Sequence, residues 1–316
     1  MSWLFVALSA YLFLAVANLF DKFLVDNVIK NSKAYAFVAC FLGAIVFLVA
    51  TWFLDWPGIN LFVLNLLNGA VFALALCLLY EDLRRGEASR VLVFIGGLTP
   101  VFSLIFSLLF FKEHFSSQQL IGISFSLSGV FLIAFLPQQR GYLSRLANKL
   151  KISLGNKNNR ALLIAFFSAL AYSIYFISTK TAYNGQEFIS AFIWTRIGSA
   201  LFVLLFLFEP AVRKEIRKML FNKEKEPKKN SGFLVIVNQL LGSAGFILQN
   251  YAIFLGSVVL VNALQGLQYA LLLILSAVLA ALAPKLLKES FSWRIMFWKI
   301  AAVIMIAIGF YFLALK

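Results

Sequence analysis

Residues 81–115 read EDLRRGEASRVLVFIGGLTPVFSLIFSLLFFKEHF, and this stretch decides the fold. The charged turn at its start leads into an apolar run that is about long enough to cross a bilayer as a helix. Gly96, Gly97 and Pro100 lie in the middle of this run. Small residues let another helix approach closely, and a proline loosens the helical backbone. The stretch therefore predicts a transmembrane helix between two interfacial loops.

The composition of the whole chain is also that of a membrane protein. Of its 316 residues, 62% are hydrophobic and 13% are charged. A soluble domain of this size could not bury so much apolar surface. The net charge of +15 would suggest nucleic acid as a partner of a soluble protein, but here the basic residues lie between apolar blocks. They indicate membrane topology and contact with anionic lipid, and we expect no nucleic-acid partner.

The apolar blocks recur along the chain at the length of a spanning helix. Ten can be marked, at residues 3–20, 34–54, 61–80, 90–111, 118–136, 161–179, 188–208, 232–250, 257–283 and 295–314. Most are close to the twenty or so residues that a spanning helix needs. The longest must tilt or bend. We therefore predict an all-α polytopic membrane protein with ten transmembrane helices.

The connections between these blocks alternate between two kinds. Five are charged, among them residues 21–33 and 81–90, whereas the other four are nearly bare of charge. Of the 28 Lys and Arg residues, 23 lie in the charged connections and three in the bare ones or the tails. Basic residues collect on the cytoplasmic side of a cell membrane. We therefore predict a multi-pass protein of the cell membrane with charged loops in the cytoplasm and both termini outside.

Metal-binding and nucleophilic side chains are few. Cys40 and Cys77 lie far apart inside apolar blocks, and His114 is the single histidine of the sequence. This pattern predicts neither a metal site, a disulfide nor a His-based triad. We expect no enzyme activity, no metal and no cofactor.

The two halves of the chain share landmarks in the same order. Asp21-Lys22 parallels Thr179-Lys180, and KEHFS at 112–116 parallels KESFS at 288–292. Each half holds five apolar blocks, and an odd number turns the second copy upside down relative to the first. Many secondary transporters follow this inverted-repeat plan, with the substrate near the midplane between the halves. The competing explanation is chance similarity between apolar sequences.

The repeat defines the domain boundaries that we predict. Residues 1–137 form a first five-helix repeat, 138–160 a basic connecting loop, and 161–316 a second five-helix repeat. The second repeat contains a basic loop at 209–231, whose first half has the spacing of an amphipathic surface helix. One such pair makes a monomer sufficient, and a dimer is also compatible with the sequence.

These features together resemble the EamA domain of the drug/metabolite transporter superfamily. The resemblance lies in RGEASR at 85–90, in LTPVF at 98–102, in FKE at 111–113 and in the glycine-rich block that follows. It implies a ten-helix carrier that moves small organic solutes, often outward, by alternating access. Lys112 departs from the pattern, because the family commonly has glycine there. The charge count departs as well, because the family commonly places its termini in the cytoplasm.

Arg196 lies well inside the seventh apolar block. An ionisable group at that depth is costly and calls for a partner or a function. One interpretation is an anion-attracting group in a transport cavity, and the resemblance implies that a basic residue is common there. The other is a structural arginine that bonds helix-end carbonyls or a carboxylate such as Glu187. The sequence leaves both open.

Amide and tyrosine side chains inside the blocks form a second set of candidates. Asn262, Gln265 and Gln268 are spaced by three and share a broad helix face. Amides both donate and accept hydrogen bonds, so they suit a neutral or zwitterionic solute, but they also hold membrane helices together. The predicted substrate-binding residues are Arg196, Asn262, Gln265, Gln268, Asn250, Gln239, Asn68 and Tyr172.

The predicted function is secondary transport of a small polar organic metabolite, amino-acid-like or similar, with export as the expected direction. The alternative is a flippase or carrier for a phospholipid or a polyprenyl-phosphate-linked sugar, which basic cavity residues would favour. A membrane enzyme needs clustered carboxylates, histidines or metal ligands, and the sequence has no such cluster. No carboxylate is expected at mid-membrane, so uniport and exchange are equally compatible with the sequence.

Overall fold

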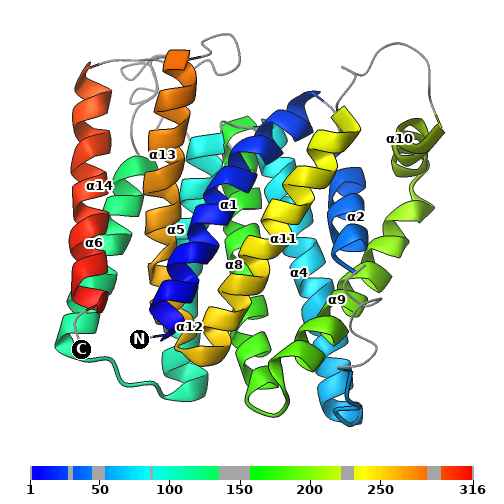
Figure 1. Ribbon diagram of the computed structural model, residues 1–316, viewed down its shortest axis with the longest axis horizontal. Coiled ribbons are helices and arrows are strands. Elements are labelled where there is room, and N and C mark those ends of the chain that lie inside the picture. Colours follow the sequence, from blue (N-terminus) through cyan, green and yellow to red (C-terminus); the bar gives the residue numbers. More distant parts are fainter. Residues whose placement is uncertain are drawn as a thin grey trace.

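The fold is an upright bundle of helices, seen in the computed structural model of Figure 1. The structure describes residues 2–27, 31–44, 54–85, 88–134, 157–221, 231–282 and 293–314, and within these ranges it contains no strand. The helices of the first half are α1 (Ser2–Asn27), α2 (Ser32–Gly43), α4 (Ile59–Arg85), α5 (Ala88–Phe106), η1 (Ser107–Phe111) and α6 (Ser117–Ala134). Those of the second half are α8 (Lys157–Tyr183), α9 (Phe188–Leu204), η2 (Leu205–Phe208), α10 (Pro210–Phe221), α11 (Ser231–Leu255), α12 (Val258–Ala263), α13 (Gln265–Leu282) and α14 (Trp293–Ala314).

The helices confirm an all-α multi-pass membrane protein. Within the described residues, six helical stretches are long and apolar enough to cross a membrane, and four shorter apolar helices accompany them. Large apolar side chains cover the outside of the bundle, such as Phe5, Phe110 and Phe208, which are 67%, 71% and 81% exposed. Lipid is the solvent that such a surface fits. Each of the ten predicted blocks contains a described helix, but the count of ten crossings stays a prediction.

The two kinds of connection lie at opposite ends of the bundle. The start of α1 and the end of α14 lie at the lower end in Figure 1, together with the turns between α8 and α9 and between α11 and α12. We call this the bare-loop end. The last turns of α1 and α4 and the first turns of α8 and α11 lie at the other, charged-loop end. Which end faces the cytoplasm stays a prediction.

Close packing between helices distant in sequence organises the bundle. α1 packs along α11, α4 lies against both α8 and α9, and α6 packs along α14. The last contact is close because both helices carry glycine: a Cβ atom at Gly129 would lie 2.7 Å from the Ala302 carbonyl oxygen, and one at Gly309 would lie 2.3 Å from Ser126 Oγ. Small residues at the crossing are the usual means by which membrane helices approach. The division into two repeats stays a prediction.

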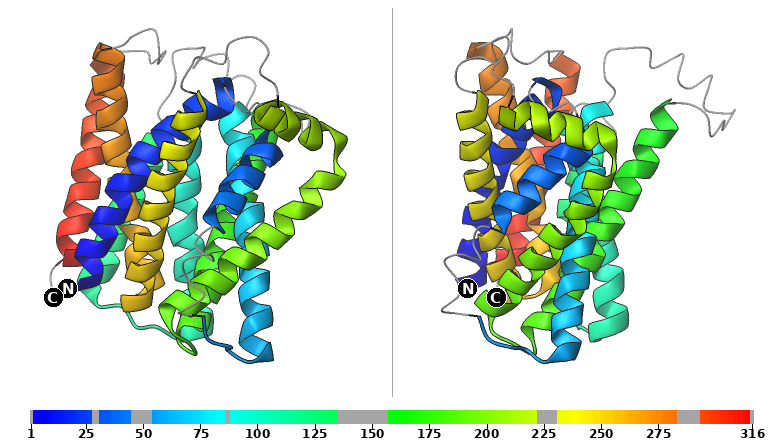
Figure 2. Two further views of the ribbon diagram at one scale, coloured as in Figure 1. Left: turned by 45° about the vertical axis from the view of Figure 1, so that its right-hand side comes forward. Right: turned by 90° about the vertical axis from the view of Figure 1, so that its right-hand side faces the viewer.

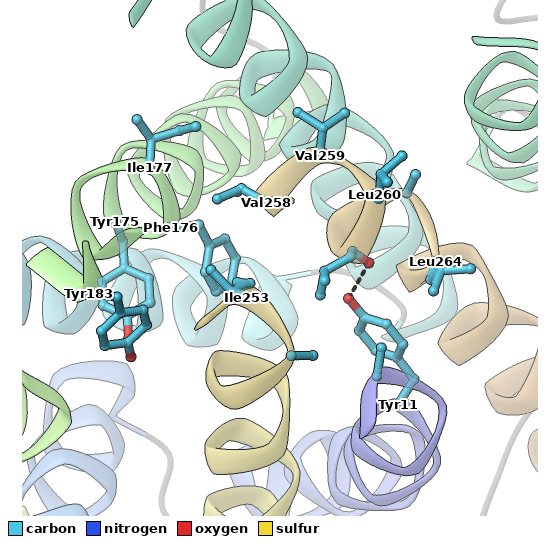
Figure 3. Packing of buried hydrophobic residues seen from close by; sticks show 14 of the residues in the cluster. Tyr11, Tyr175, Phe176, Ile177, Tyr183, Ile253, Val258, Val259, Leu260 and Leu264 are labelled. Carbon is cyan, nitrogen blue, oxygen red and sulfur yellow. Dashed lines mark hydrogen bonds between the residues drawn. The ribbon is translucent and has the colours of Figure 1, made fainter. Parts of the chain in front are cut away.

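The ninth block bends, as its length requires. α12 and α13 meet at Leu264, which separates the two helices. Tyr11 of α1 donates a hydrogen bond from its hydroxyl to the Val261 carbonyl oxygen at 2.6 Å, just before the bend. Figure 3 shows this bond and the surrounding core, where side chains from α1, α8, α11 and α12 meet. The bend is therefore fixed by tertiary contacts.

The amphipathic helix predicted in the 209–231 loop is α10. It lies across the charged-loop end of the bundle, seen most clearly in Figure 2. Val212 is fully buried, and Ile216 packs against the core, whereas Arg213 and Lys214 are exposed. A helix with one apolar and one basic face suits the membrane interface. Residues 222–230, like the 138–156 part of the connecting loop and the 288–292 turn, lie outside the described residues.

Lys112 occupies a backbone conformation that favours glycine, the residue that the EamA pattern commonly has at this position. Its φ is 51°, in the left-handed region, directly after η1. Glycine adopts this region without the Cβ clash that other residues incur.

We expect Lys112→Gly to stabilise the protein by about 1 kcal/mol, measured as a rise in the melting temperature. Lys112→Ala keeps the Cβ atom and serves as the control; an equal rise with alanine would contradict the backbone explanation.

Candidate functional site

A cavity of about 750 Å³, including its open mouth, lies inside the bundle. Residues of α1, α2, α4, α8, α9 and α11 line it. The polar side chains of its lining are Asn18, Asp21, Tyr80, Tyr172, Arg196, Asn238, Gln239 and Ser243.

Arg196 is the cationic group of this cavity. Its guanidinium carbon lies 4.4 Å from the ring centre of Phe72, 4.7 Å from that of Phe192 and 4.5 Å from that of Phe246. The residue is 7% exposed. Three ring faces, one from each of α4, α9 and α11, stabilise the buried charge through cation–π attraction. The N–H groups of a guanidinium point outward in the plane of the guanidinium itself. Contacts of its carbon with ring faces therefore leave these N–H groups able to bind an anion.

The structural interpretation of Arg196 finds little support in its surroundings. Among the described residues, no carboxylate forms an ion pair with Arg196, and Glu187 is not within ion-pair distance of it. None of the hydrogen bonds between described residues uses the Arg196 side chain either. The cation is therefore held by aromatic rings rather than by a fixed counter-ion.

Asp21 is an acidic lining residue that the sequence reading did not select. We expected a charged connection to begin at this residue, but α1 continues to Asn27, and Asp21 is only 8% exposed. Its Oδ1 accepts hydrogen bonds from the Tyr35 hydroxyl at 2.6 Å and from Asn238 Nδ2 at 2.7 Å. A carboxylate thus lies inside the bundle and lines the cavity, less than two helical turns from the end of α1.

A second cavity of about 490 Å³ adjoins the first. The two share several lining residues, among them Asn18, Tyr172 and Phe246. Three amides line the second cavity with polar atoms that have no partner among the described residues: Gln249 Nε2, Gln265 Oε1 and Gln268 Oε1. Unpaired buried polar atoms are costly, and a polar solute or water in the cavity would satisfy them.

Five of the predicted binding residues line these cavities. Arg196 and Gln239 line the first cavity, Gln265 and Gln268 line the second, and Tyr172 lines both. The structure thus brings together side chains from α8, α9, α11 and α13. Their role in binding stays a prediction.

The other three predicted residues lie outside both cavity linings. Asn250 Oδ1 accepts hydrogen bonds from the Tyr175 hydroxyl at 2.9 Å and the Tyr183 hydroxyl at 3.1 Å. Asn262 Nδ2 donates to Ser103 Oγ at 2.9 Å. Asn68 is 2% exposed, and its Nδ2 has no partner among the described residues. Asn250 and Asn262 therefore connect helices to one another in this structure.

The cavity lining contains further side chains that we did not predict from the sequence, and a sequence signal exists for those of α1. Leu14, Ala17, Asn18 and Asp21 line the cavity and repeat at helical spacing along α1. A helix face that carries both an amide and a carboxylate inside an apolar block is such a signal. Phe72, Phe246 and Asn238 gave no signal of this kind, because only their contacts across helices distinguish them.

Hydrogen bonds connect the turns at the bare-loop end of the bundle. Lys180 Nζ, at the end of α8, donates to the carbonyl oxygens of Ile253 at 3.0 Å, Phe254 at 3.1 Å and Gly256 at 2.9 Å. We call this group the Lys180 clamp. It satisfies carbonyl groups at the C-terminal end of α11, which an isolated helix would leave without partners. Close by, Ser257 Oγ donates to Glu113 Oε2 at 2.8 Å.

Metal-binding side chains do not gather in the described part of the chain. No group of three or more His, Cys, Asp or Glu residues lies together there, and Cys40 and Cys77 are both buried and free.

Comparisons with known proteins find similarity to transporters and to a solved structure. Residues 1–135 match the family model of the EamA-like transporter family. A protein of Bacillus subtilis (strain 168) named uncharacterized transporter YdfC is 29% identical over 153 residues, which are 48% of this chain and 43% of that protein. The matched stretch thus spans less than half the length of that relative. A solved crystal structure aligns over 97% of this chain and 96% of its own with a TM-score of 0.62 and 14% identity, which shows the fold alone.

Proposed function

Because residues 1–135 match the model of the EamA-like transporter family, we propose that this membrane protein is a secondary carrier that exports a small polar organic metabolite. The single observation that carries the proposal is Arg196, a buried cation that lines a cavity and has no anionic partner among the described residues. The match to a transporter family also favours transport over catalysis.

The shape of the bundle supports alternating access. Asp21, Tyr80 and Asn238 extend the cavity lining to within about two helical turns of the charged-loop end. The Lys180 clamp holds the opposite end together. A cavity that extends toward one end, with hydrogen bonds between turns at the other end, fits one state of a carrier. With the charged loops in the cytoplasm, this state would load solute from the cytoplasm for export.

Arg196→Gln tests the proposal. We would measure thermal stabilisation of the purified full chain by amino acids, nucleosides, sugar phosphates and polyprenyl phosphates, followed by counterflow in liposomes with any class that stabilises it. A solute with an anionic group should raise the melting temperature of the wild type. Loss of charge-assisted hydrogen bonds in Arg196→Gln should weaken its binding by at least about tenfold.

Arg160→Gln is the matched control, because Arg160 is exposed at the start of α8 and lines neither cavity. It should bind like the wild type. Stabilisation by polyprenyl phosphates alone would replace the metabolite carrier with the flippase. Equal binding by wild type and Arg196→Gln would remove Arg196 from the site.

A further inference from the structure

We infer that Asp21, Tyr35 and Asn238 form a binding site for a protonated primary amine, so that the carried solute bears an ammonium group. We call these three residues the Asp21 cluster. The inference rests on the proposed carrier function and names a chemical feature of its substrate. It assigns a role to a carboxylate that lies inside the bundle and lines the larger cavity.

The hydrogen bonds of the cluster decide what it can bind. The Tyr35 hydroxyl donates to Asp21 Oδ1, and Asn238 Nδ2 donates both to Asp21 Oδ1 and, at 3.3 Å, to the Tyr35 oxygen. All the N–H and O–H donors of the three side chains are then used. The remaining capacity consists of acceptors: Asn238 Oδ1 is buried without a partner among the described residues, and Asp21 Oδ2 accepts no hydrogen bond from them.

A set of free acceptors around a carboxylate calls for a ligand that donates and is positively charged. A primary ammonium group has three N–H donors and one positive charge, which match this site. An anion would meet only acceptors. Calcium or magnesium would need about six oxygen ligands, more than the cluster presents.

In the part of the chain that the structure describes, the groups found near Asp21 are hydroxyl and amide groups. Tyr35 contributes from α2, Tyr80 from α4 and Tyr172 from α8, and α11 contributes the amide Asn238. Among the described residues no lysine or arginine forms an ion pair with Asp21. A carboxylate buried without a counter-ion is costly, and a bound ammonium group would supply that counter-ion.

Arg196 and Asp21 give the same cavity one positive and one negative group. The same lining includes apolar side chains such as Leu14, Leu76 and Phe246. A solute with a carboxylate, an ammonium group and an apolar part would satisfy both charges and cover the apolar lining. Such a solute carries no net charge, which lowers the cost of bringing it into the bundle.

The test uses three compounds with one shared apolar chain. L-Leucine carries an ammonium and a carboxylate group, 3-methylbutylamine carries the ammonium group alone, and 4-methylpentanoate carries the carboxylate alone. We would measure the shift of the melting temperature of the purified full chain with each compound. Leucine should give the largest shift in the wild type, and the amine should also give one.

Asp21→Asn should abolish the shift caused by the amine, weaken leucine binding by at least tenfold and leave the shift with 4-methylpentanoate in place. That retained shift shows that the variant is folded. Asp82→Asn is the matched control, because Asp82 is a buried acid of α4 that lines neither cavity. It should respond to all three compounds like the wild type.

A pH series on the wild type tests the same site without a substitution. A proton and an ammonium group compete for the Asp21 carboxylate, so the shift caused by the amine should decline as the pH is lowered, while the compound itself stays protonated. The shift caused by 4-methylpentanoate should not decline in this way. The series therefore decides the question even when Asp21→Asn fails to fold.

Two results would overturn the assignment. One is an absence of any amine effect on the wild type while 4-methylpentanoate still stabilises it through Arg196; the carrier would then stand without the cation site. The other is an unchanged amine shift in Asp21→Asn. If none of the three compounds, nor any class in the wider screen, stabilises the wild type, the proposed carrier function fails as well.

Discussion

Replacement of Gly198 by alanine is expected to prevent the bundle from folding. A Cβ atom at Gly198 would lie 2.5 Å from the Leu66 carbonyl oxygen and 2.6 Å from the Leu66 Cα atom. The facing residue has the same constraint, because a Cβ atom at Gly69 would lie 2.2 Å from the Thr195 carbonyl oxygen. Backbone atoms on both helices cannot move aside as a flexible side chain can. The cost should exceed about 3 kcal/mol, the upper part of the range for overpacking.

The measurement is the yield of monodisperse protein after extraction, with the melting temperature of whatever is recovered. Gly198→Ala and Gly69→Ala should both fail or melt far below the wild type. Gly242→Ala is the control for stability, because its Cβ atom would meet only Ala17 Cβ at 3.7 Å, an ordinary contact. Wild-type stability of Gly198→Ala would mean that α4 and α9 do not cross as closely as described.

The architecture was predictable because hydropathy reports a transfer free energy, which depends on each segment alone. A run of apolar residues favours lipid wherever its neighbours are. Each apolar block therefore contains a described helix, and the length of the block at 257–283 predicted a tilt or a bend, of which the structure shows the bend. The amphipathic spacing within 209–231 likewise predicted α10.

The end of α1 was predicted less well, and the error hid Asp21. The sequence reading ended the first helix where the first charged residue appears, but the helix continues for about two turns beyond it, to Asn27. Helix boundaries are the least certain part of such a reading. A charged residue ends an apolar run in a hydropathy plot, yet it can remain in the helix when partners on other helices, here Tyr35 and Asn238, bond to it.

The amides show why the site could be predicted only in part. Their spacing predicts one helix for Asn262, Gln265 and Gln268, but Asn262 lies on α12 and the two glutamines lie on α13, after the bend at Leu264. Asn262 bonds to Ser103 on α5, whereas Gln265 and Gln268 line a cavity. A spacing rule cannot distinguish an amide that connects helices from one that faces a solute. The same limit applies to Arg196, whose three aromatic partners come from three helices.

Lys180→Met is expected to open the bare-loop end. The substitution keeps an apolar stem of similar length but removes the three N–H donors that bind the carbonyl groups of Ile253, Phe254 and Gly256. A hydrogen bond from a charged group contributes about 1.5–3 kcal/mol. Loss of the clamp should therefore shift the equilibrium between the closed and the open bare-loop end by about a hundredfold or more toward the open state.

The shift can be measured through a buried reporter close to the clamp. Ala252 is fully buried on α11, so Ala252→Cys, with Cys40 and Cys77 replaced by alanine, should react slowly with a water-soluble maleimide. Lys180→Met should speed this reaction by about a hundredfold, because labelling of a buried thiol follows the population of the open state.

Lys112→Met is the matched control: Lys112 lies at the same end, is exposed and makes no side-chain hydrogen bond with the described residues. An equal labelling rate in wild type and Lys180→Met would show that the bare-loop end is held by its apolar contacts rather than by the clamp. A faster rate only in Lys180→Met would identify three hydrogen bonds as the barrier that a carrier must break to expose its cavity at this end.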